Sequence, residues 1–220
     1  MERTLGIVFL CIVLGYSSCH TKSLSSKAKL GTGKSAALGE ETLTSKFLSE
    51  DELLEYVRTS QLIKSNKIGG APFDTVVYNK VIVYDFEGNL YPYTSIIDRK
   101  GKFVPVVSKQ QYLTQKQASS LLSSLTKNSS YGEDELSCFI PHFAVVLFQD
   151  NKFVSQINIC LHCNRLYSDV YIPAQSYHKV HKGTQYEYSI NGLSSKGRKK
   201  IVDLSLELGF RYGIDTSKIN

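Results

Sequence analysis

The sequence predicts one α+β domain, with a mainly antiparallel sheet and about three helices, behind a signal peptide and a flexible tether. Three observations lead to this fold class. Two capping boxes each precede apolar residues at helical spacing. Runs of β-branched and aromatic residues are separated by short turn sequences, which favours antiparallel hairpins. Residues 20–46, in contrast, contain no amphipathic pattern from which a core could be built.

The start of the chain is typical of an export signal. A short polar start contains Arg3, an apolar run extends from Leu5 to Tyr16, and small residues precede Cys19. This run is shorter than the roughly 20 residues that a membrane-spanning helix needs. We therefore expect residues 1–18 to be a lipoprotein-type signal peptide and the mature protein to be exported.

Two kinds of cleavage fit this leader. Bacterial lipoproteins carry an aliphatic residue and two small residues before the cysteine that receives the lipid. Here Ser17 and Ser18 precede Cys19, but Tyr16 departs from the aliphatic position. Ordinary signal peptidase would instead cut after Ser17 and release a soluble periplasmic or secreted protein. The cysteine favours lipidation of Cys19, so the expected partner is a membrane of the cell envelope, reached through a lipid anchor.

Residues 19–46 are predicted to form a lipid-anchored flexible tether. They are rich in Ser, Thr, Lys, Gly and Ala, and they contain no aromatic residue. Such a segment cannot bury enough apolar surface to offset its ordering entropy. Half of the net charge of +6 lies in this segment, so the remaining chain has only a small positive surplus. Because the positive surplus is small and the chain is expected to be exported, we do not expect nucleic acid as a partner.

The single domain is predicted over residues 47–220, a length sufficient for its own core. A helix is expected after Ser49, because Ser49-x-x-Glu52 is a capping box before an apolar stripe. Pro92 and Pro105 lie in strand-like runs, which indicates edges or bulges of an antiparallel meander. The strands expected in this half cover residues 75–86, 90–97 and 103–107.

The second half of the domain adds two helices and a hairpin. Thr114-x-x-Gln117 is a second capping box, and a last helix is expected from Lys196 to Leu208, with Gly209 as its left-handed stop. The dipeptide Asp150-Asn151 separates two apolar runs, which is a strong hairpin signal. The strands expected in this half cover residues 143–149, 153–161, 167–172 and 185–190.

The hairpin brings the three cysteines of the predicted domain together. A two-residue turn at Asp150-Asn151 determines the register, and this register places Cys138 opposite Cys163. It also places His142 opposite the residue before Cys160. We therefore expect three thiols and one imidazole to gather at the open end of the hairpin.

Three interpretations of this cluster stay open. The first is a structural disulfide from Cys138 to Cys163 or to Cys160, which suits an oxidising compartment. The second is a zinc site, in which His142 or His162 completes the three thiolates. The third is redox chemistry at Cys160 and Cys163, although this C-x-x-C follows a strand-like run instead of beginning a helix. The disulfide is favoured, and the expected cofactor is accordingly none or zinc.

Two segments of the chain, Cys138-Phe-Ile-Pro-His142 and Ile157-Asn-Ile-Cys160-x-x-Cys163, are familiar as a set. In them the chain resembles a group of uncharacterised exported proteins and lipoproteins of Bacteroidota bacteria. Gly192-Leu-Ser-Ser and a helix ending in Leu208-Gly-Phe also fit the group. The resemblance implies a bacterial envelope lipoprotein, in agreement with the leader, and it implies no known activity.

One weaker site is suggested by Lys196, Arg198 and Lys199, which gather at the start of the predicted last helix. Such a group suggests an anion site, although a solvated basic face is the favoured explanation. The sequence contains no G-x-S-x-G, no H-E-x-x-H and no EF-hand loop. We therefore expect a non-enzymatic binding or structural module whose ligand, a protein or a glycan, stays open. The alternative is an exported thiol-disulfide oxidoreductase.

Overall fold

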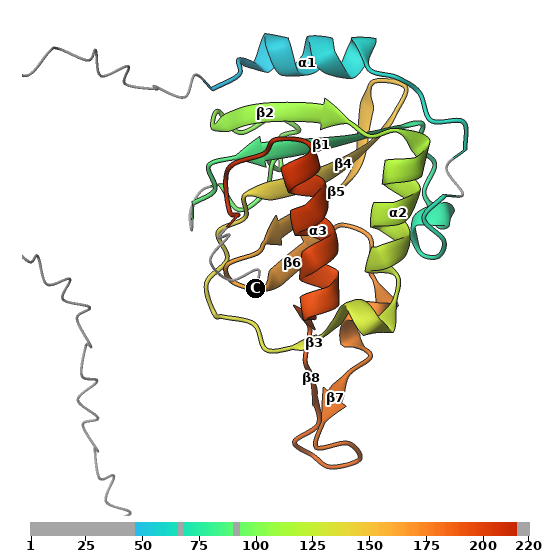
Figure 1. Cartoon of the computed structure of the whole chain (residues 1–220), viewed down its shortest axis with the longest axis vertical. Helices are drawn as coiled ribbons and strands as arrows, with labels where there is room; N and C mark the ends of the chain where they lie inside the picture. The colour runs from blue at the N-terminus through green and yellow to red at the C-terminus, as the bar shows by residue number, and fades with distance from the viewer. Residues whose placement is uncertain (1–46, 66–67, 90–92, 215–220) are drawn as a thin grey trace, which may run out of the picture. The chain divides into compact units, whose positions relative to one another are not determined.

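The computed structural model describes residues 47–65, 68–89 and 93–214, which belong to one compact unit. The predicted signal peptide (1–18), the tether (19–46) and the lipidation site Cys19 lie outside the described residues. The described part forms an α+β domain with three α-helices and a five-stranded antiparallel sheet, as the sequence predicts (Figure 1). No helix in this part is long and apolar enough to cross a bilayer.

The sheet is antiparallel throughout, with the strand order β2-β1-β4-β5-β6. Its central strands β1 and β4 are buried on both faces and rich in β-branched and aromatic residues, which suits strands between two layers. Side chains alternate along a strand, so each strand presents one set of residues to an inner face and another to an outer face. The strands are β1 (Lys80–Phe86), β2 (Val107–Tyr112), β4 (Phe143–Gln149), β5 (Lys152–Cys160) and β6 (Arg165–Ser168).

Two helices cover the inner face, namely α2 (Gln115–Leu125) and α3 (Ser195–Glu207). α2 begins at the predicted capping box, in which Thr114 and Gln117 exchange hydrogen bonds. α3 ends near Gly209, whose φ of +65° provides the predicted left-handed stop. Apolar side chains of the helices meet those of the strands in the main core, which contains Val83, Val145, Ile157, Leu122 and Ile201.

The outer face is covered over part of its width. α1 (Glu50–Thr59) and residues 93–106, named here the covering segment, pack on β1 and β4. α1 begins at the predicted capping box of Ser49 and Glu52. Over β5 and β6 the outer face carries polar side chains and opens into a cleft. The core under the cover contains Leu53, Val57, Ile82, Tyr84, Ile96 and Val146.

Smaller elements complete the domain. β3 (Tyr131–Glu133) pairs with β9 (Gly192–Leu193), next to the start of α3. β7 (Lys179–Val180) and β8 (Tyr188–Ser189) form a hairpin that protrudes from the body of the domain (Figure 1). Three short 3₁₀ helices lie in the connections that the structure describes: η1 (Phe73–Thr75), η2 (Asn128–Ser130) and η3 (Pro173–Ser176).

The predicted meander after β1 is wrong. Of the described residues 93–106, none belongs to a strand, and Ile97 makes only an isolated bridge to Phe103. The strand that pairs with β1 begins at Val107, and β1 itself begins at Lys80 instead of residue 75. The covering segment stays irregular because side chains of β5, instead of a ladder, bind the backbone N–H groups of Ile96 and Ile97.

The β4–β5 hairpin has the predicted turn but a different register at its open end. Gln149 pairs with Lys152 around the turn, as expected. A β-bulge at Val154 then shifts the ladder by one residue, so Ile159 lies opposite Phe143 instead of His142. A bulge of this kind has no clear signal in the sequence, because it inserts one extra residue into an otherwise regular strand.

Candidate functional site

The structure brings the sulfur atoms of the three cysteines together. The Sγ atoms of Cys160 and Cys163 lie at disulfide-bonding distance, and the Sγ atom of Cys138 lies 3.2 Å from that of Cys163. The disulfide expected from the sequence joins Cys138 to Cys163 or to Cys160, whereas in the structure Cys160 and Cys163 are the closest pair. Phe139 packs on the cysteines and forms a small core with them.

The turn between β5 and β6 holds this cluster in place. Cys160 is the last residue of β5, and the chain reverses through Asn164, whose φ is +56°. The backbone N–H of Cys163 donates to the Sγ atom of Cys160 over 3.0 Å. The carboxamide of Asn164 donates to the carbonyl oxygen of Asp134 over 2.8 Å. The bond from Asn164 keeps the segment that contains Cys138 against the turn.

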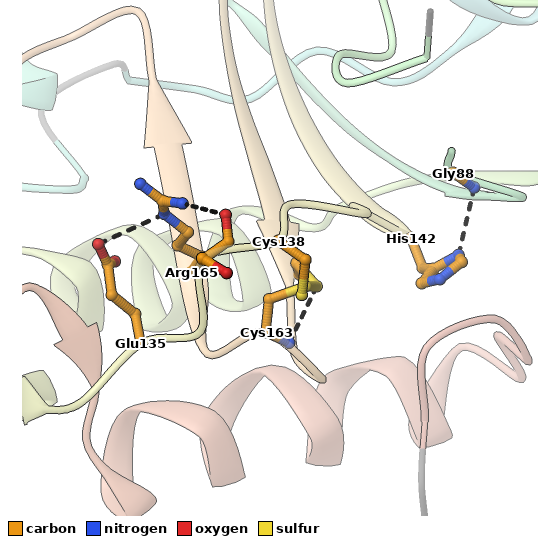
Figure 2. Close-up of a disulfide and its surroundings, with 8 residues drawn as sticks. Gly88, Glu135, Cys138, His142, Cys163 and Arg165 are labelled. Atoms are coloured by element: carbon orange, nitrogen blue, oxygen red, sulfur yellow. Dashed lines mark hydrogen bonds and ion pairs between the residues drawn. A yellow bond between two sulfur atoms is a disulfide. The ribbon is translucent and has the colours of Figure 1, made fainter. Parts of the chain in front are cut away.

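Arg165 fastens the same segment. Its guanidinium donates to the carbonyl oxygen of Ser137 over 3.0 Å, and its Nε atom lies 3.3 Å from the carboxylate of Glu135 (Figure 2). Because Arg165 follows the turn and Glu135 precedes Cys138, these contacts tie the two chain segments together beside the sulfur atoms.

His142 lies apart from the sulfur atoms. Its Nδ1 atom lies 3.2 Å from the backbone nitrogen of Gly88, and its ring stacks on Tyr212. Figure 2 shows the imidazole directed towards Gly88 and away from Cys138. His162 is exposed on the turn. Among the described residues, no group of three or more His, Cys, Asp or Glu side chains is arranged to hold a metal ion.

The location of Cys160 and Cys163 also bears on redox chemistry. Both side chains are 0 % exposed, and they flank a turn between two strands instead of a helix N-terminus. Reactive cysteines are accessible and lie where their thiolates are stabilised. Cys138, which is half-buried, is the most accessible of the three. The arrangement is therefore closer to a structural cluster than to a surface dithiol.

The predicted anion site at the start of α3 contains a carboxylate of the protein itself. Glu133 accepts hydrogen bonds from the backbone N–H (2.6 Å) and hydroxyl (2.9 Å) of Ser195, and it pairs with Arg198 at 2.7 Å. Burial raises the pKa of Glu133, but these partners outweigh burial and bring its pKa below the ordinary value. Lys199 forms an ion pair within α3, and Lys196 is exposed. Glu133 thus occupies the position where an external anion would bind.

A polar cleft lies on the outer face, between the covering segment and strands β5 and β6. Its volume is about 520 Å³, within the range of small-molecule sites. Gln156 and Asn158 of β5 form its floor. Its other polar and aromatic lining residues are Thr94, Ser95, Asp98, Arg99, Phe153, Tyr167, Ser168 and Asp169.

The floor amides hold the covering segment. The carboxamide of Gln156 accepts from the N–H of Ile97 (3.1 Å) and donates to its carbonyl oxygen (3.0 Å). The Oδ1 atom of Asn158 accepts from the N–H of Ile96 over 2.9 Å. Although Asn158 is only 4 % exposed, its Nδ2 atom donates to no described residue and is not sealed from solvent. The two N–H groups of this Nδ2 atom are available to a ligand in the cleft.

Two carboxylates and a guanidinium lie around the floor. Asp169 accepts a hydrogen bond from the backbone N–H of Gln156 at 3.1 Å, through Oδ2. Asp98 accepts from the backbone N–H groups of Lys102 and Lys100 through Oδ1, and these bonds, chiefly that of Lys102, hold its pKa below the ordinary value. Within the described residues, the second oxygen of each carboxylate accepts no hydrogen bond. Each therefore has an acceptor to offer.

An aromatic ring with fixed orientation forms one wall. Tyr167, which pairs with Asn158 across the sheet, is 50 % exposed. Phe139 packs edge-on against it, with ring centroids 4.4 Å apart, and the guanidinium carbon of Arg165 lies 5.2 Å from its centroid. Because Phe139 belongs to the cysteine core, the cysteine cluster supports this wall of the cleft.

The sequence-based reasoning did not identify the cleft, although one signal was present. Polar and apolar residues alternate from Gln156 to Ile159, which places two amides on one face of a strand. Alternation of this kind indicates a face in contact with water. It cannot show that the covering segment folds over these amides and turns the exposed face into a cleft.

No protein-family model, curated protein or solved structure matches this chain. The geometry of the described residues and the leader sequence are therefore the basis of the functional argument.

Proposed function

We propose that this chain is an exported cell-envelope lipoprotein whose folded domain is a non-enzymatic binding module. The observation that carries the binding role is the polar cleft, with the unengaged Nδ2 atom of Asn158 at its floor. This donor is open to solvent, so a bound ligand with a hydrogen-bond acceptor can replace water there. The envelope location rests on the leader sequence and on Cys19.

The charges of the cleft favour binding over acid–base catalysis. A general acid needs a carboxyl group whose pKa is raised towards neutrality. Backbone N–H groups, chiefly that of Lys102, instead lower the pKa of Asp98, so this carboxylate stays ionised. An ionised carboxylate accepts hydrogen bonds from a ligand but does not protonate a leaving group.

The cysteine cluster has a supporting role in this proposal. Cys160 and Cys163 form a structural disulfide that supports Phe139, and Phe139 in turn supports Tyr167. Peptide mapping without reduction should find a disulfide-linked peptide, and elemental analysis should find no stoichiometric zinc. Stoichiometric zinc bound to three reduced thiols would replace this role with a metal site.

A ligand screen tests the binding role. The full chain is heated with saccharides, amino acids, short peptides and nucleosides, and at least one class should raise the melting temperature. The same ligand should not stabilise Asn158→Asp, which keeps the acceptor for Ile96 but replaces the free N–H groups with an oxygen. If no class raises the melting temperature, the binding role is wrong.

The mass of the processed N-terminus tests the anchor. The mature chain should begin at an acylated Cys19 and partition into detergent, whereas Cys19→Ser should lose both properties. A chain that begins at Ser18 without acyl groups would contradict the anchor. That result would leave the binding role untouched.

One observation favours thiol-disulfide exchange as a second function. From its position 3.2 Å away, the thiolate of Cys138 can attack the Sγ atom of Cys163, which forms a new disulfide and releases Cys160 as a thiolate. Rapid alkylation of Cys138 in the native protein, with turnover of a disulfide substrate, would support this function. A thiol inert to alkylation would count against it.

A further inference from the structure

We propose that the cleft between the covering segment and β5–β6 is a binding site for a neutral saccharide, with Tyr167 as its stacking platform. This inference rests on the proposed binding function and names its ligand class. It concerns the same cleft, but it depends on a different set of observations. These are the balance of hydrogen-bond donors and acceptors, the exposed aromatic rings, and a described lining that contains both positive and negative side chains.

The hydrogen-bonding groups of the cleft suit a ligand with many hydroxyl groups. The Nδ2 atom of Asn158 offers donors, and one oxygen each of Asp98 and Asp169 offers an acceptor. A sugar hydroxyl both donates and accepts, so neighbouring hydroxyls can satisfy a carboxylate and an amide at the same time. Arg99 lies in the same lining and adds a further donor group.

The aromatic rings suit the apolar faces of a sugar ring. Tyr167 is 50 % exposed and Phe153 is 39 % exposed, and both belong to the lining of the cleft. The C–H groups of a pyranose carry partial positive charge, whereas the face of an aromatic ring carries partial negative charge. A sugar ring stacked on Tyr167 would place its hydroxyl edge near Asn158, the residue across the strand pair.

The site is preorganised in the absence of a ligand. Asn158 is held by the N–H of Ile96, and Tyr167 is contacted by Phe139 and Arg165. Little side-chain entropy is therefore lost when a ligand binds, which favours weak polar ligands that make few apolar contacts.

A peptide or an anion fits the same cleft less well. β5 is hydrogen-bonded to β4 on one side and to β6 on the other, so the floor has no free strand edge for a peptide backbone. The two carboxylates, Asp98 and Asp169, oppose an anionic ligand, while Arg99 opposes a cationic one. The mixed charge favours a neutral, polar ligand.

Calorimetric titration of the full chain with neutral trisaccharides, such as maltotriose, cellotriose, mannotriose and chitotriose, tests the proposal. At least one should bind, and Tyr167→Ala should weaken its affinity about tenfold or more, while Tyr167→Phe should retain it. Tyr186→Ala is the matched control, because Tyr186 is 69 % exposed and lies on the β7–β8 hairpin, outside the cleft lining. This variant should bind as the unchanged chain does.

Three outcomes overturn the saccharide site. The first is the absence of binding by every trisaccharide at ~10 mM. The second is binding that Tyr167→Ala leaves unchanged. The third is a melting-temperature response to peptides or nucleosides alone that Asn158→Asp abolishes, which would keep the binding module but reject its saccharide ligand.

Discussion

The inner and outer faces of the sheet differ although the same strands form both. On the inner face, apolar side chains extend from β1 to β6 beneath α2 and α3. On the outer face, they extend over β2, β1 and β4, beneath α1 and the covering segment, and stop before β5. Within β5, Ile157 and Ile159 face inwards, whereas Gln156 and Asn158 face outwards into the cleft.

This difference separates stability from binding. The burial of apolar side chains dominates the free energy of folding, so the inner face can supply most of the stability. The outer half of β5 and β6 is thereby free to carry amides, carboxylates and an exposed ring. Substitutions on the two faces should consequently differ both in the size of their effects and in the property that they change.

The largest effect is expected in the main core. Leu122 of α2 is fully buried, and Leu122→Ala should lower the free energy of unfolding by about 2–5 kcal/mol, because it removes apolar burial and leaves a cavity. The matched change on the open side of the outer face, Phe153→Ala, should cost less than about 1 kcal/mol. Urea denaturation measures both. Similar losses for the two variants would contradict the division between the faces.

The next effect concerns the cysteine cluster at the end of the cleft. Cys163→Ala removes the sulfur that both possible disulfides share and should cost about 2 kcal/mol, the loop entropy of a short closed loop. Cys138→Ala should cost less, because Cys160 and Cys163 keep their bond. If Cys138→Ala is instead as damaging as Cys163→Ala, and each costs about 3.5 kcal/mol, the bond runs from Cys138 to Cys163 across a longer loop.

A smaller effect is expected at the attachment of the covering segment. Gln156→Ala removes two hydrogen bonds to Ile97 and should cost about 1–3 kcal/mol. Amide exchange should become faster at Ile96 and Ile97, while amides of β4 and α2 stay protected. Unchanged exchange in the covering segment would show that apolar packing alone holds it in place.

The smallest effect concerns the carboxylate on the inner face of β1. Burial raises the pKa of Asp85, against the hydrogen bonds from the backbone of Arg211 and Tyr212 and from Ser108. Because the pKa of Asp85 is raised in the folded state, its carboxyl group contributes fully to the free energy of unfolding below about pH 4, the pKa of Asp in the unfolded chain. This contribution is lost as the pH rises through the folded-state pKa.

Asp85→Asn should remove this dependence. Relative to the unchanged chain, the free energy of unfolding of the variant should rise between pH 4 and pH 7, on top of a constant loss because an amide nitrogen replaces one acceptor oxygen. Thermal unfolding at a series of pH values measures the difference. A difference that does not vary with pH would mean that the carboxyl group has an ordinary pKa.

Local features could be predicted from the sequence because they depend on residues close together in the chain. The capping boxes at Ser49 and Thr114, the stop at Gly209 and the turn at Asp150-Asn151 all stand in the structure where the sequence places them. The gathering of the cysteines also followed from the turn, because a hairpin brings residues at equal distances from its turn together.

Features that depend on distant residues were mispredicted or missed. The runs 90–97 and 103–107 have strand-like composition, yet their described part is irregular up to the start of β2. The reason is that Asn158 and Gln156 bind the backbone of Ile96 and Ile97, which lie 62 and 59 positions earlier in the chain. Contacts with Gly88 and Tyr212 hold the imidazole of His142 outside the predicted cysteine site. Neither event is visible within a window of sequence.

By itself, the sequence determined the α+β class, the helix ends and the central hairpin, since hydrogen bonds and apolar spacing within a few residues specify them. Only the tertiary structure decided that two amides of β5 would be largely buried beneath the covering segment, and that Tyr167 would lie beside them as a supported ring. The physical reason is that a polar strand face becomes a cleft when a distant segment satisfies part of its hydrogen bonds and leaves the rest open.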